Sequence, residues 1–356
     1  MFRSLLNFLR QTVAIIFGGN RQQQATYVYV TNQGGNTISQ YRVAANGHLR
    51  PLVMKTVATG TTPVFIKIAP NAQFAYVANQ GSNSISQYRI AADGNLLSLA
   101  MPVAAGTSPV DIAITPSGKF AYVANSSSNE VSQYLIDAQG MLKPLSPATI
   151  ETGLIPVAIA VDPGGEYVYV VNNSSNDISQ FQIQENGTLL AMHQPTAVTG
   201  NAPRGLAIDP NGKYVYVVNR GNDSVAQFEI KHDGSLSPLA TPVACGKHPI
   251  FMRISDNGKY AYVVNQNSNN ISQYALAANG RLVPMAPSSV PCAITPVCVA
   301  ATPSGRYVYA TNISSNNISQ YAVGSHGELA PMVVNSWGDS TIRADISPRC
   351  IATVTC

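Results

Sequence analysis

Residues 27–40 read YVYVTNQGGNTISQ, and close copies of this stretch recur along the chain. The second copy, FAYVANQGSNSISQ, begins at Phe74, and the fourth, YVYVVNNSSNDISQ, begins at Tyr167. The asparagine that ends the first half of each copy returns every 46 or 47 residues, as Asn32, Asn79, Asn125, Asn172, Asn219, Asn265 and Asn312. A fixed period of this length is typical of propellers and solenoids. The sequence therefore predicts a repeat protein of seven units.

Each unit has the pattern of four short strands joined by tight turns. In the second unit, 64–69 is an apolar run, 74–78 and 85–90 alternate, and 96–104 is a fourth run. The Asp-Gly pair that ends at Gly94 is a hairpin signal, because it readily adopts the positive φ angles of a tight turn. Four antiparallel strands within a period in the forties are typical of one propeller blade. We therefore predict an all-β fold, a seven-bladed β-propeller of four-stranded antiparallel blades.

Several residues are repeated in all seven units, and we assign them structural roles. A single active site needs its chemistry only once, whereas every blade needs the same packing. The hairpin glycines, each followed two residues later by leucine, are Gly47, Gly94, Gly140, Gly187, Gly234, Gly280 and Gly327. The glutamines of the third strands, which we predict to form hydrogen bonds between blades rather than to bind a ligand, are Gln40, Gln87, Gln133, Gln180, Gln227, Gln273 and Gln320.

The two ends of the chain predict how the ring closes. The first unit begins directly at its second strand, and residues 341–348 resemble the innermost strand that 63–70 supplies in the second unit. We predict that this C-terminal strand completes the first blade. The propeller is accordingly assigned to residues 26–349, and residues 350–356 are assigned to a C-terminal tail whose place in the fold is left open.

Residues 1–25 lie outside the repeat and form a signal-like, anchor-like or amphipathic segment. Arg3 precedes an apolar stretch that Asn7 and Arg10 interrupt, and no clear cleavage signal follows. No run is long enough for an ordinary transmembrane helix, but the apolar residues fall near helical spacing and suit a helix lying on a membrane. Any membrane contact is expected through residues 1–24. An extracytoplasmic or membrane-associated location is favoured, with a cytoplasmic protein as the alternative.

Composition limits the classes of partner and cofactor. The net charge is +4, and charged residues make up only 11% of the chain, which is too dilute for a nucleic-acid-binding surface. Five cysteines without a CxxC pair argue against a zinc site, and a disulfide that involves Cys350 or Cys356 is expected only if the protein is exported. We expect a monomer without metal or cofactor, whose partner is another protein or a small anionic or sugar ligand.

Residues that depart from the repeat on the innermost strands are candidates for a site, because these strands line the central channel. At the fourth place after the proline that opens each blade, most units carry a small residue, and Lys67, Arg253 and Asp345 are the exceptions. Two places earlier, Asp111 and Arg343 add further charges. The sequence thus predicts a ring of charges in the channel. Alternatively, Asp345 and Lys67 form an ion pair that stabilises ring closure.

The fifth unit departs most from the others. It carries Arg204 directly after Pro203 and Arg220 in the following loop, and His248 lies near the predicted channel mouth. His248 is a candidate base or simply an exposed histidine. No GxSxG, HExxH, phosphate-loop or calcium-loop motif is present. The candidates for catalysis are therefore Asp111, His248 and Asp345, and those for ligand binding are Lys67, Arg204, Arg220, Arg253 and Arg343.

The repeat core YVTN at 29–32, with its variants YVAN, YVVN and YATN, and the pattern PxxIAIxPxG at 109–118 resemble the YVTN-type seven-bladed β-propellers. These belong with the lactonase propeller family, whose enzyme members resemble 6-phosphogluconolactonase, and the resemblance covers about residues 27–348. It implies that an enzyme would carry a histidine after one blade proline, which has no counterpart here, an Arg-His pair after another, and a glutamate after a strand asparagine. Here Arg204 has the arginine place, whereas Gly205 replaces the histidine and Arg220 replaces the glutamate.

Two functions of different class remain open. The first is a non-catalytic scaffold that binds a partner or a small ligand, which the nearly identical polar loops and the missing family histidines favour. The second is a 6-phosphogluconolactonase-like sugar-lactone hydrolase of carbohydrate metabolism. Lactone hydrolysis needs a base or an activated water, together with positive charge where the carbonyl oxygen becomes negative. Arg204, Arg253 and Lys67 suit the binding of a phosphorylated or carboxylated ligand.

Overall fold

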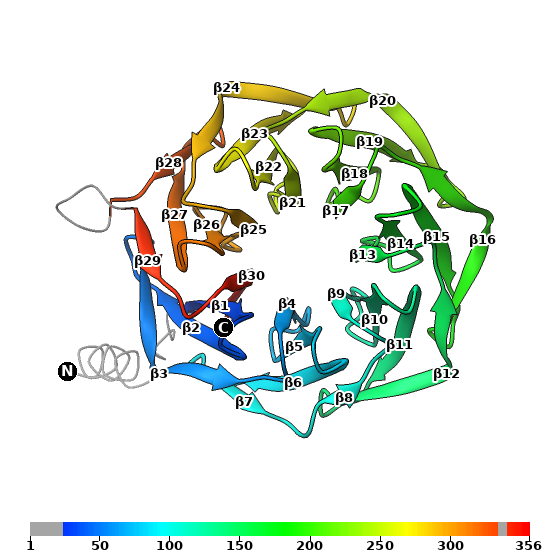
Figure 1. The fold of residues 1–356 in the computed structure, drawn as a ribbon, viewed down its shortest axis with the longest axis horizontal. Helices are drawn as coiled ribbons and strands as arrows, with labels where there is room; N and C mark the ends of the chain where they lie inside the picture. Colours follow the sequence, from blue (N-terminus) through cyan, green and yellow to red (C-terminus); the bar gives the residue numbers. More distant parts are fainter. Residues whose placement is uncertain (1–23, 334–339) are drawn as a thin grey trace, which may run out of the picture.

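The computed structural model describes residues 24–333 and 340–356, and this part of the chain forms seven antiparallel sheets around a central axis (Figure 1). The predicted all-β, seven-bladed propeller is therefore confirmed. Residues 1–23 of the segment expected to be a signal, an anchor or an amphipathic helix lie outside the described residues. Among the residues that are described, no helix has the length and apolar character needed to cross a membrane.

The two inner strands of each blade carry most of the core. The innermost strands all begin at proline: β4 (Pro63–Ile68), β9 (Pro109–Ile114), β13 (Pro156–Val161), β17 (Pro203–Ile208), β21 (Pro249–Ile254), β25 (Pro296–Ala301) and β30 (Pro348–Thr355). The second strands all end at the repeated asparagine: β1 (Thr26–Asn32), β5 (Phe74–Asn79), β10 (Phe120–Asn125), β14 (Tyr167–Asn172), β18 (Tyr214–Asn219), β22 (Tyr260–Asn265) and β26 (Tyr307–Asn312).

The outermost strand of each blade faces solvent, whereas the third strand is largely buried. The third strands are β2 (Thr37–Val43), β6 (Ser84–Ile90), β11 (Glu130–Ile136), β15 (Asp177–Ile183), β19 (Ser224–Ile230), β23 (Asn270–Leu276) and β27 (Asn317–Val323). Continuous outermost strands are β3 (Leu49–Ala58), β12 (Leu142–Glu151), β16 (Leu189–Val198), β20 (Leu236–Ala244) and β24 (Leu282–Pro291). In the second and seventh blades this strand is split, into β7 (Leu96–Ser98) with β8 (Val103–Ala104) and β28 (Leu329–Pro331) with β29 (Thr341–Arg343).

Adjacent blades are joined through the aromatic residues of the second strands and the hairpin glycines. The ring of Tyr167 lies so close to Gly234 of the next blade that an added Cβ would come within 2.3 Å of it. Gly234 also has a φ of 81°, a left-handed conformation that glycine adopts without strain. Tyr169, two residues after Tyr167, is fully buried and donates a hydrogen bond of 2.6 Å to the Gly234 carbonyl. Each hairpin glycine is therefore required by its contact with the neighbouring blade as well as by its turn.

The repeated glutamines connect neighbouring blades, as predicted. Gln180 is buried, its Nε2 donates to the Gln194 carbonyl in its own blade, and its Oε1 accepts from the Leu236 N–H in the next blade, at 2.8 and 2.7 Å. The same bond links the last blade to the first, because Gln320 Oε1 accepts from the Leu49 N–H. The leucine that follows each hairpin glycine is thus held at its main chain by the preceding blade.

A C-terminal strand completes the first blade, but it is not the segment expected from the sequence. β30, which begins at Pro348, pairs with β1, whereas residues 341–343 form β29 and pair with β27 at the rim of the seventh blade (Figure 1). The assignment of 341–348 to the closing strand is therefore wrong. Residues 350–355, assigned to a tail beyond the propeller, lie within this closing strand.

An inserted segment in the outermost strand of the seventh blade explains the error. Pro296 follows Leu282 by 14 residues, whereas Pro348 follows Leu329 by 19. The backbone before each blade proline confirms the register, because Ser347 has a positive φ of 55° and its N–H donates to Asn316 Oδ1 of the preceding blade. The equivalent residues at the other six prolines also have positive φ values, and each N–H donates to a side-chain Oδ1 of the preceding blade, which belongs to an asparagine in five cases and to Asp223 at His248: Thr62, Ser108, Ile155, Ala202, His248 and Thr295.

Candidate functional site

The central channel widens into a hollow at each end, with a narrow neck between them. The first hollow, with a cavity volume of about 90 Å³, lies where the innermost strands begin, and the second, of about 450 Å³, extends along their later residues. Both hollows are lined by the residues of the neck, which are Phe65, Asp111, Leu206, Phe251 and Cys350. We call the first hollow the mouth, because it opens between the loops that follow the second strands.

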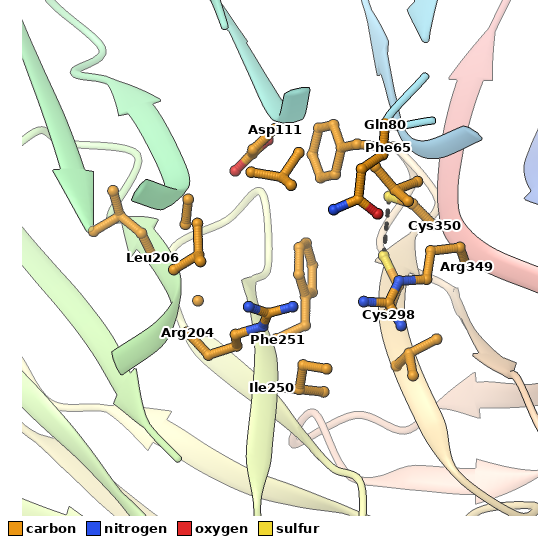
Figure 2. Close-up of a pocket in the computed structure, with 16 residues that line it drawn as sticks. Phe65, Gln80, Asp111, Arg204, Leu206, Ile250, Phe251, Cys298, Arg349 and Cys350 are labelled. Atoms are coloured by element: carbon orange, nitrogen blue, oxygen red, sulfur yellow. Dashed lines mark hydrogen bonds between the residues drawn. The ribbon is translucent and has the colours of Figure 1, made fainter. Parts of the chain in front are cut away.

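Two arginines from distant blades meet in the mouth. Arg204 is the second residue of β17 and Arg349 is the second residue of β30, so both follow a blade proline. Their guanidinium groups point toward each other across the hollow, and Gln80 and Asp111 also line it (Figure 2). Among the described residues, neither guanidinium has a hydrogen-bonding or ion-pair partner. Two unpaired positive groups therefore face one small space.

The electrostatic state of these arginines reflects their burial. Burial, together with the positive charges of Arg349 and Arg220, lowers the pKa of Arg204 to about 10. Burial likewise lowers the pKa of Arg349. Both side chains remain charged near neutral pH, yet each has lost much of its hydration. A desolvated guanidinium without a partner is stabilised by an anion, which supplies charge and two acceptors for its planar fork.

Asp111 is the acidic group of the neck. Its side chain is buried, Oδ1 accepts from its neighbour's N–H at Ile112, and Oδ2 accepts from the Ile159 N–H of the next blade, at 2.7 and 3.0 Å. Burial raises the pKa of this carboxyl to about 7, although both backbone donors and the Lys67 ammonium favour the charged form. Asp111 therefore changes its protonation state near neutral pH.

Two of the predicted ligand-binding residues lie at the opposite end of the channel. Lys67 and Arg253 occupy equivalent places in β4 and β21 and line the second hollow. Burial lowers the pKa of the Lys67 ammonium, and the charge of Arg253 acts in the same direction. Arg253 is exposed and forms an ion pair of 2.8 Å with Asp256. The predicted ring of charges is thus divided into separate groups by the neck.

Two further candidates lie outside the mouth. Arg220 is exposed in the loop after β18, and its influence on Arg204 is electrostatic. His248 occupies the positive-φ place before Pro249, where its N–H donates to Asp223 Oδ1. Lys247 Nζ binds the other oxygen of Asp223 at 2.8 Å. The backbone of His248 therefore serves the link between two blades.

Arg343 and Asp345 do not lie on the channel, which corrects two of the sequence predictions. Arg343 is exposed at the end of β29, the outermost strand of its blade. Asp345 lies in the link that follows, where its Oδ2 accepts a hydrogen bond from Thr37 Oγ1 at 2.8 Å. The alternative ion pair between Asp345 and Lys67 is therefore wrong as well. The shift in the register of the closing strand explains both errors.

Arg349 and Gln80 were not among the site residues predicted from the sequence. The Pro348-Arg349 pair repeats Pro203-Arg204, and it would have been recognised had Pro348 been aligned with the blade prolines. Gln80 follows the last residue of its second strand, the place that Arg220 occupies in the fifth unit. In the described part of the chain, no three His, Cys, Asp or Glu side chains gather as a metal site would require. The mouth therefore presents two unpaired guanidinium groups and one amide to the same hollow.

Comparisons with known proteins agree with the fold. The family model described as Lactonase, 7-bladed beta-propeller matches residues 53–153, 144–248 and 206–301. A putative 6-phosphogluconolactonase from Bacteroides fragilis superposes with a TM-score of 0.81 at 21% identity, over 94% of this chain and 99% of that one. The periplasmic gluconolactonase of Pseudomonas aeruginosa superposes with a TM-score of 0.79 at 19% identity, over 93% of this chain and 99% of that one.

No curated protein matches the chain. Identities near 20% establish a common fold and leave the activity open. The family model spans well over half of the sequence, and its matches overlap in successive blades. The chain belongs to the lactonase family of seven-bladed β-propellers.

Proposed function

We propose that this propeller binds a small anionic ligand, such as a carboxylated or phosphorylated sugar, in the mouth of its channel. The observation that carries the proposal is the pair of unpaired guanidinium groups, Arg204 and Arg349, that face the same hollow (Figure 2). Like charges brought together in a poorly hydrated space repel each other, and an anion between them removes this repulsion.

The remaining wall of the mouth suits a small polar molecule with an apolar side. Gln80 offers both a donor and an acceptor, and Val64, Val110, Val157, Ile250 and Val297 line the hollow with aliphatic surface. Ligand sites of this kind combine an apolar wall with a few polar groups that fix the orientation. Phe65 and Phe251 narrow the neck beneath, so that a ligand contacting both arginines stays in the mouth.

Equilibrium binding tests the proposal directly. Isothermal titration calorimetry would compare gluconate, 6-phosphogluconate and uncharged glucose with the full chain. We expect the anions to bind and glucose to bind at least tenfold more weakly. A hydrogen bond to a charged group contributes about 1.5–3 kcal/mol, so Arg204→Ala and Arg349→Ala should each weaken binding by roughly ten- to a hundredfold.

Arg253→Ala is the matched control, because Arg253 lies beyond the neck and is paired with Asp256. Its affinity for the anions should equal that of the wild type. Added salt should weaken binding in the wild type, since ions screen charges. Binding that ignores both mouth arginines, or no binding of any of the three ligands at millimolar concentration, would contradict the proposal.

Lactone hydrolysis in the same hollow is the second candidate, and the state of Asp111 favours it. A general base works best when its pKa lies near the working pH, and that of Asp111 is raised to about 7. With a lactone held by one arginine, the carboxylate would accept a proton from the attacking water. The other guanidinium would stabilise the negative charge that develops on the carbonyl oxygen.

This second candidate predicts saturable hydrolysis of gluconolactone or its 6-phosphate above the spontaneous rate. Activity should rise with pH through about 7 and be lost in Asp111→Asn, while the open sugar acid still binds. Hydrolysis no faster than the background for both lactones would remove the catalytic candidate and leave the binding function.

A further inference from the structure

Two buried cysteines meet at the place where the ring closes. Cys298 on β25 and Cys350 on β30 occupy the second place after the blade proline in adjacent blades. They are 2% and 3% exposed, and their sulfur atoms lie 3.2 Å apart (Figure 2). The Ile351 N–H donates to Cys298 Sγ at 3.5 Å, and aliphatic residues of the ring-closing core surround both side chains.

The two cysteines lie on the strand that closes the ring and on the neighbouring innermost strand of the seventh blade. β30 is the only strand of the first blade that comes from the C-terminal end of the described chain. Its place there depends on hydrogen bonds to β1 and on packing against β25 and β4. A bond between the two sulfur atoms would fasten the closing strand to the seventh blade and enclose residues 298–350 in a covalent loop.

We propose that Cys298 and Cys350 form a disulfide that closes the propeller covalently. The two thiols lose two protons and two electrons to a disulfide oxidant such as oxidised glutathione, which is released as two thiols. One cysteine thiolate attacks the oxidant and displaces its first thiol, and the second cysteine then attacks the mixed disulfide and displaces the other. No further oxidant is needed.

The other cysteines provide a comparison within the same chain. Cys245 and Cys292 also occupy equivalent places in adjacent blades. The Cys292 thiol, however, lies 3.0 Å from Asn312 Oδ1 and 3.5 Å from Ser319 Oγ, whereas Cys356 is exposed at the chain end. Equivalent positions in adjacent blades therefore do not by themselves bring two sulfur atoms into contact. The short contact at Cys298 and Cys350 arises because they lie on neighbouring innermost strands, where blades approach most closely.

Burial also determines when the bond forms. In the closed ring, burial raises the pKa of the Cys350 thiol well above its ordinary value, and the neighbouring sulfur adds to this effect. Because the thiolate is the reactive form, exchange with an external oxidant is slow once β30 is in place. We therefore expect oxidation during folding, before the strand docks, and slow reduction of the finished protein by added thiols.

The test counts free thiols in a variant that keeps only this pair. Tryptic peptides of the wild type would place Cys292 with Cys298 and Cys350 with Cys356, so peptide mapping alone leaves the pairing ambiguous. The variant C245S/C292S/C356S removes this ambiguity. It is refolded in a mixture of reduced and oxidised glutathione, denatured with N-ethylmaleimide present, and weighed. We expect no adduct before reduction and two adducts after it.

The matched control keeps the other equivalent pair, in the variant C298S/C350S/C356S, and should gain two adducts without reduction. In the wild type, denatured after the same refolding, three thiols should react before reduction and five after it, which provides a measurement that depends on no substitution. Reductant present during refolding should lower the unfolding temperature of the wild type and leave that of the control variant unchanged. Two adducts in the first variant before reduction, or five reactive thiols in the wild type, would overturn the proposal.

Discussion

Replacing Asp111 by asparagine should make the stability of the protein less dependent on pH. Burial raises the pKa of this carboxyl from its ordinary value of 3.8 to about 7. Between these values the folded chain keeps a proton that the unfolded chain has released. Stability therefore falls as the pH rises through this window, and the loss is complete above about pH 7. Asparagine has no such proton to lose.

The size of the effect follows from the shift. Each unit of pKa difference corresponds to about 1.4 kcal/mol, and roughly two units of the window lie between about pH 5 and pH 8. The wild type should thus lose about 3 kcal/mol of unfolding free energy over this range through Asp111, and the variant should not. The backbone N–H groups of Ile112 and Ile159 and the charge of Lys67 oppose the shift without cancelling it.

Urea unfolding followed by circular dichroism, at several pH values across this range, measures the difference between the two chains. Taking the difference cancels every titration that they share. Asp256→Asn is the control, because Asp256 is exposed and its carboxyl contacts Arg253 at the surface. A difference between wild type and Asp111→Asn that stays constant with pH would refute the reasoning, since it would mean that the carboxyl is charged in the folded state throughout. A difference that grows in the opposite direction would show that the two backbone hydrogen bonds outweigh burial.

Three further perturbations test the blade contacts and the closure. Gln180→Ala leaves the Leu236 N–H and the Gln194 carbonyl without their partner, and it should lower the unfolding free energy by about 2–4 kcal/mol in urea titrations. Gln182→Ala, on the exposed side of the same strand, should change the unfolding free energy by less than about 0.5 kcal/mol. Gly234→Ala should lower the unfolding temperature much more than Gly305→Ala, because both residues have positive φ but only the first meets an aromatic ring; equal effects would mean that backbone strain alone matters. Removing residues 348–356 exposes the edge of β1 and should give a lower unfolding temperature and aggregation in light scattering, and unchanged behaviour would contradict the closure seen here.

Much of the fold is predictable because the sequence patterns that form a blade are local and recur in every unit. The alternation within 27–40 selects strands, and the hairpin glycine selects the turn. The repeated Gln180 and its equivalents were assigned to contacts between blades because one active site does not need the same residue seven times. The hydrogen bonds of Gln180 to two different outermost strands confirm this assignment.

The sequence correctly predicted that a C-terminal strand closes the ring, but it assigned the wrong residues to that strand. The Pro348-Arg349 pair marks the start of the closing strand, as Pro203-Arg204 marks the start of the innermost strand in the fifth blade. It was missed because an inserted segment in the outermost strand of the seventh blade places Pro348 farther along the chain than the repeat predicts. A shift of several residues moved Arg343 and Asp345 from the predicted channel to the rim and brought Arg349 into the mouth. The predicted position of a residue on a strand depends on the register, because an error in the residue at which the strand begins changes the predicted position of every side chain along it.

The sequence by itself determined the number of blades, the strands within them and the residues that join one blade to the next, because each of these follows from patterns within one period. It also identified Asp111 and Arg204 as departures from the repeat on innermost strands. Only the tertiary structure decided that Arg204 shares a hollow with Arg349, and that Lys67 and Arg253 lie beyond the neck. Blades that are far apart in the sequence face one another only when the ring is closed, and closure depends on the packing of all seven blades together.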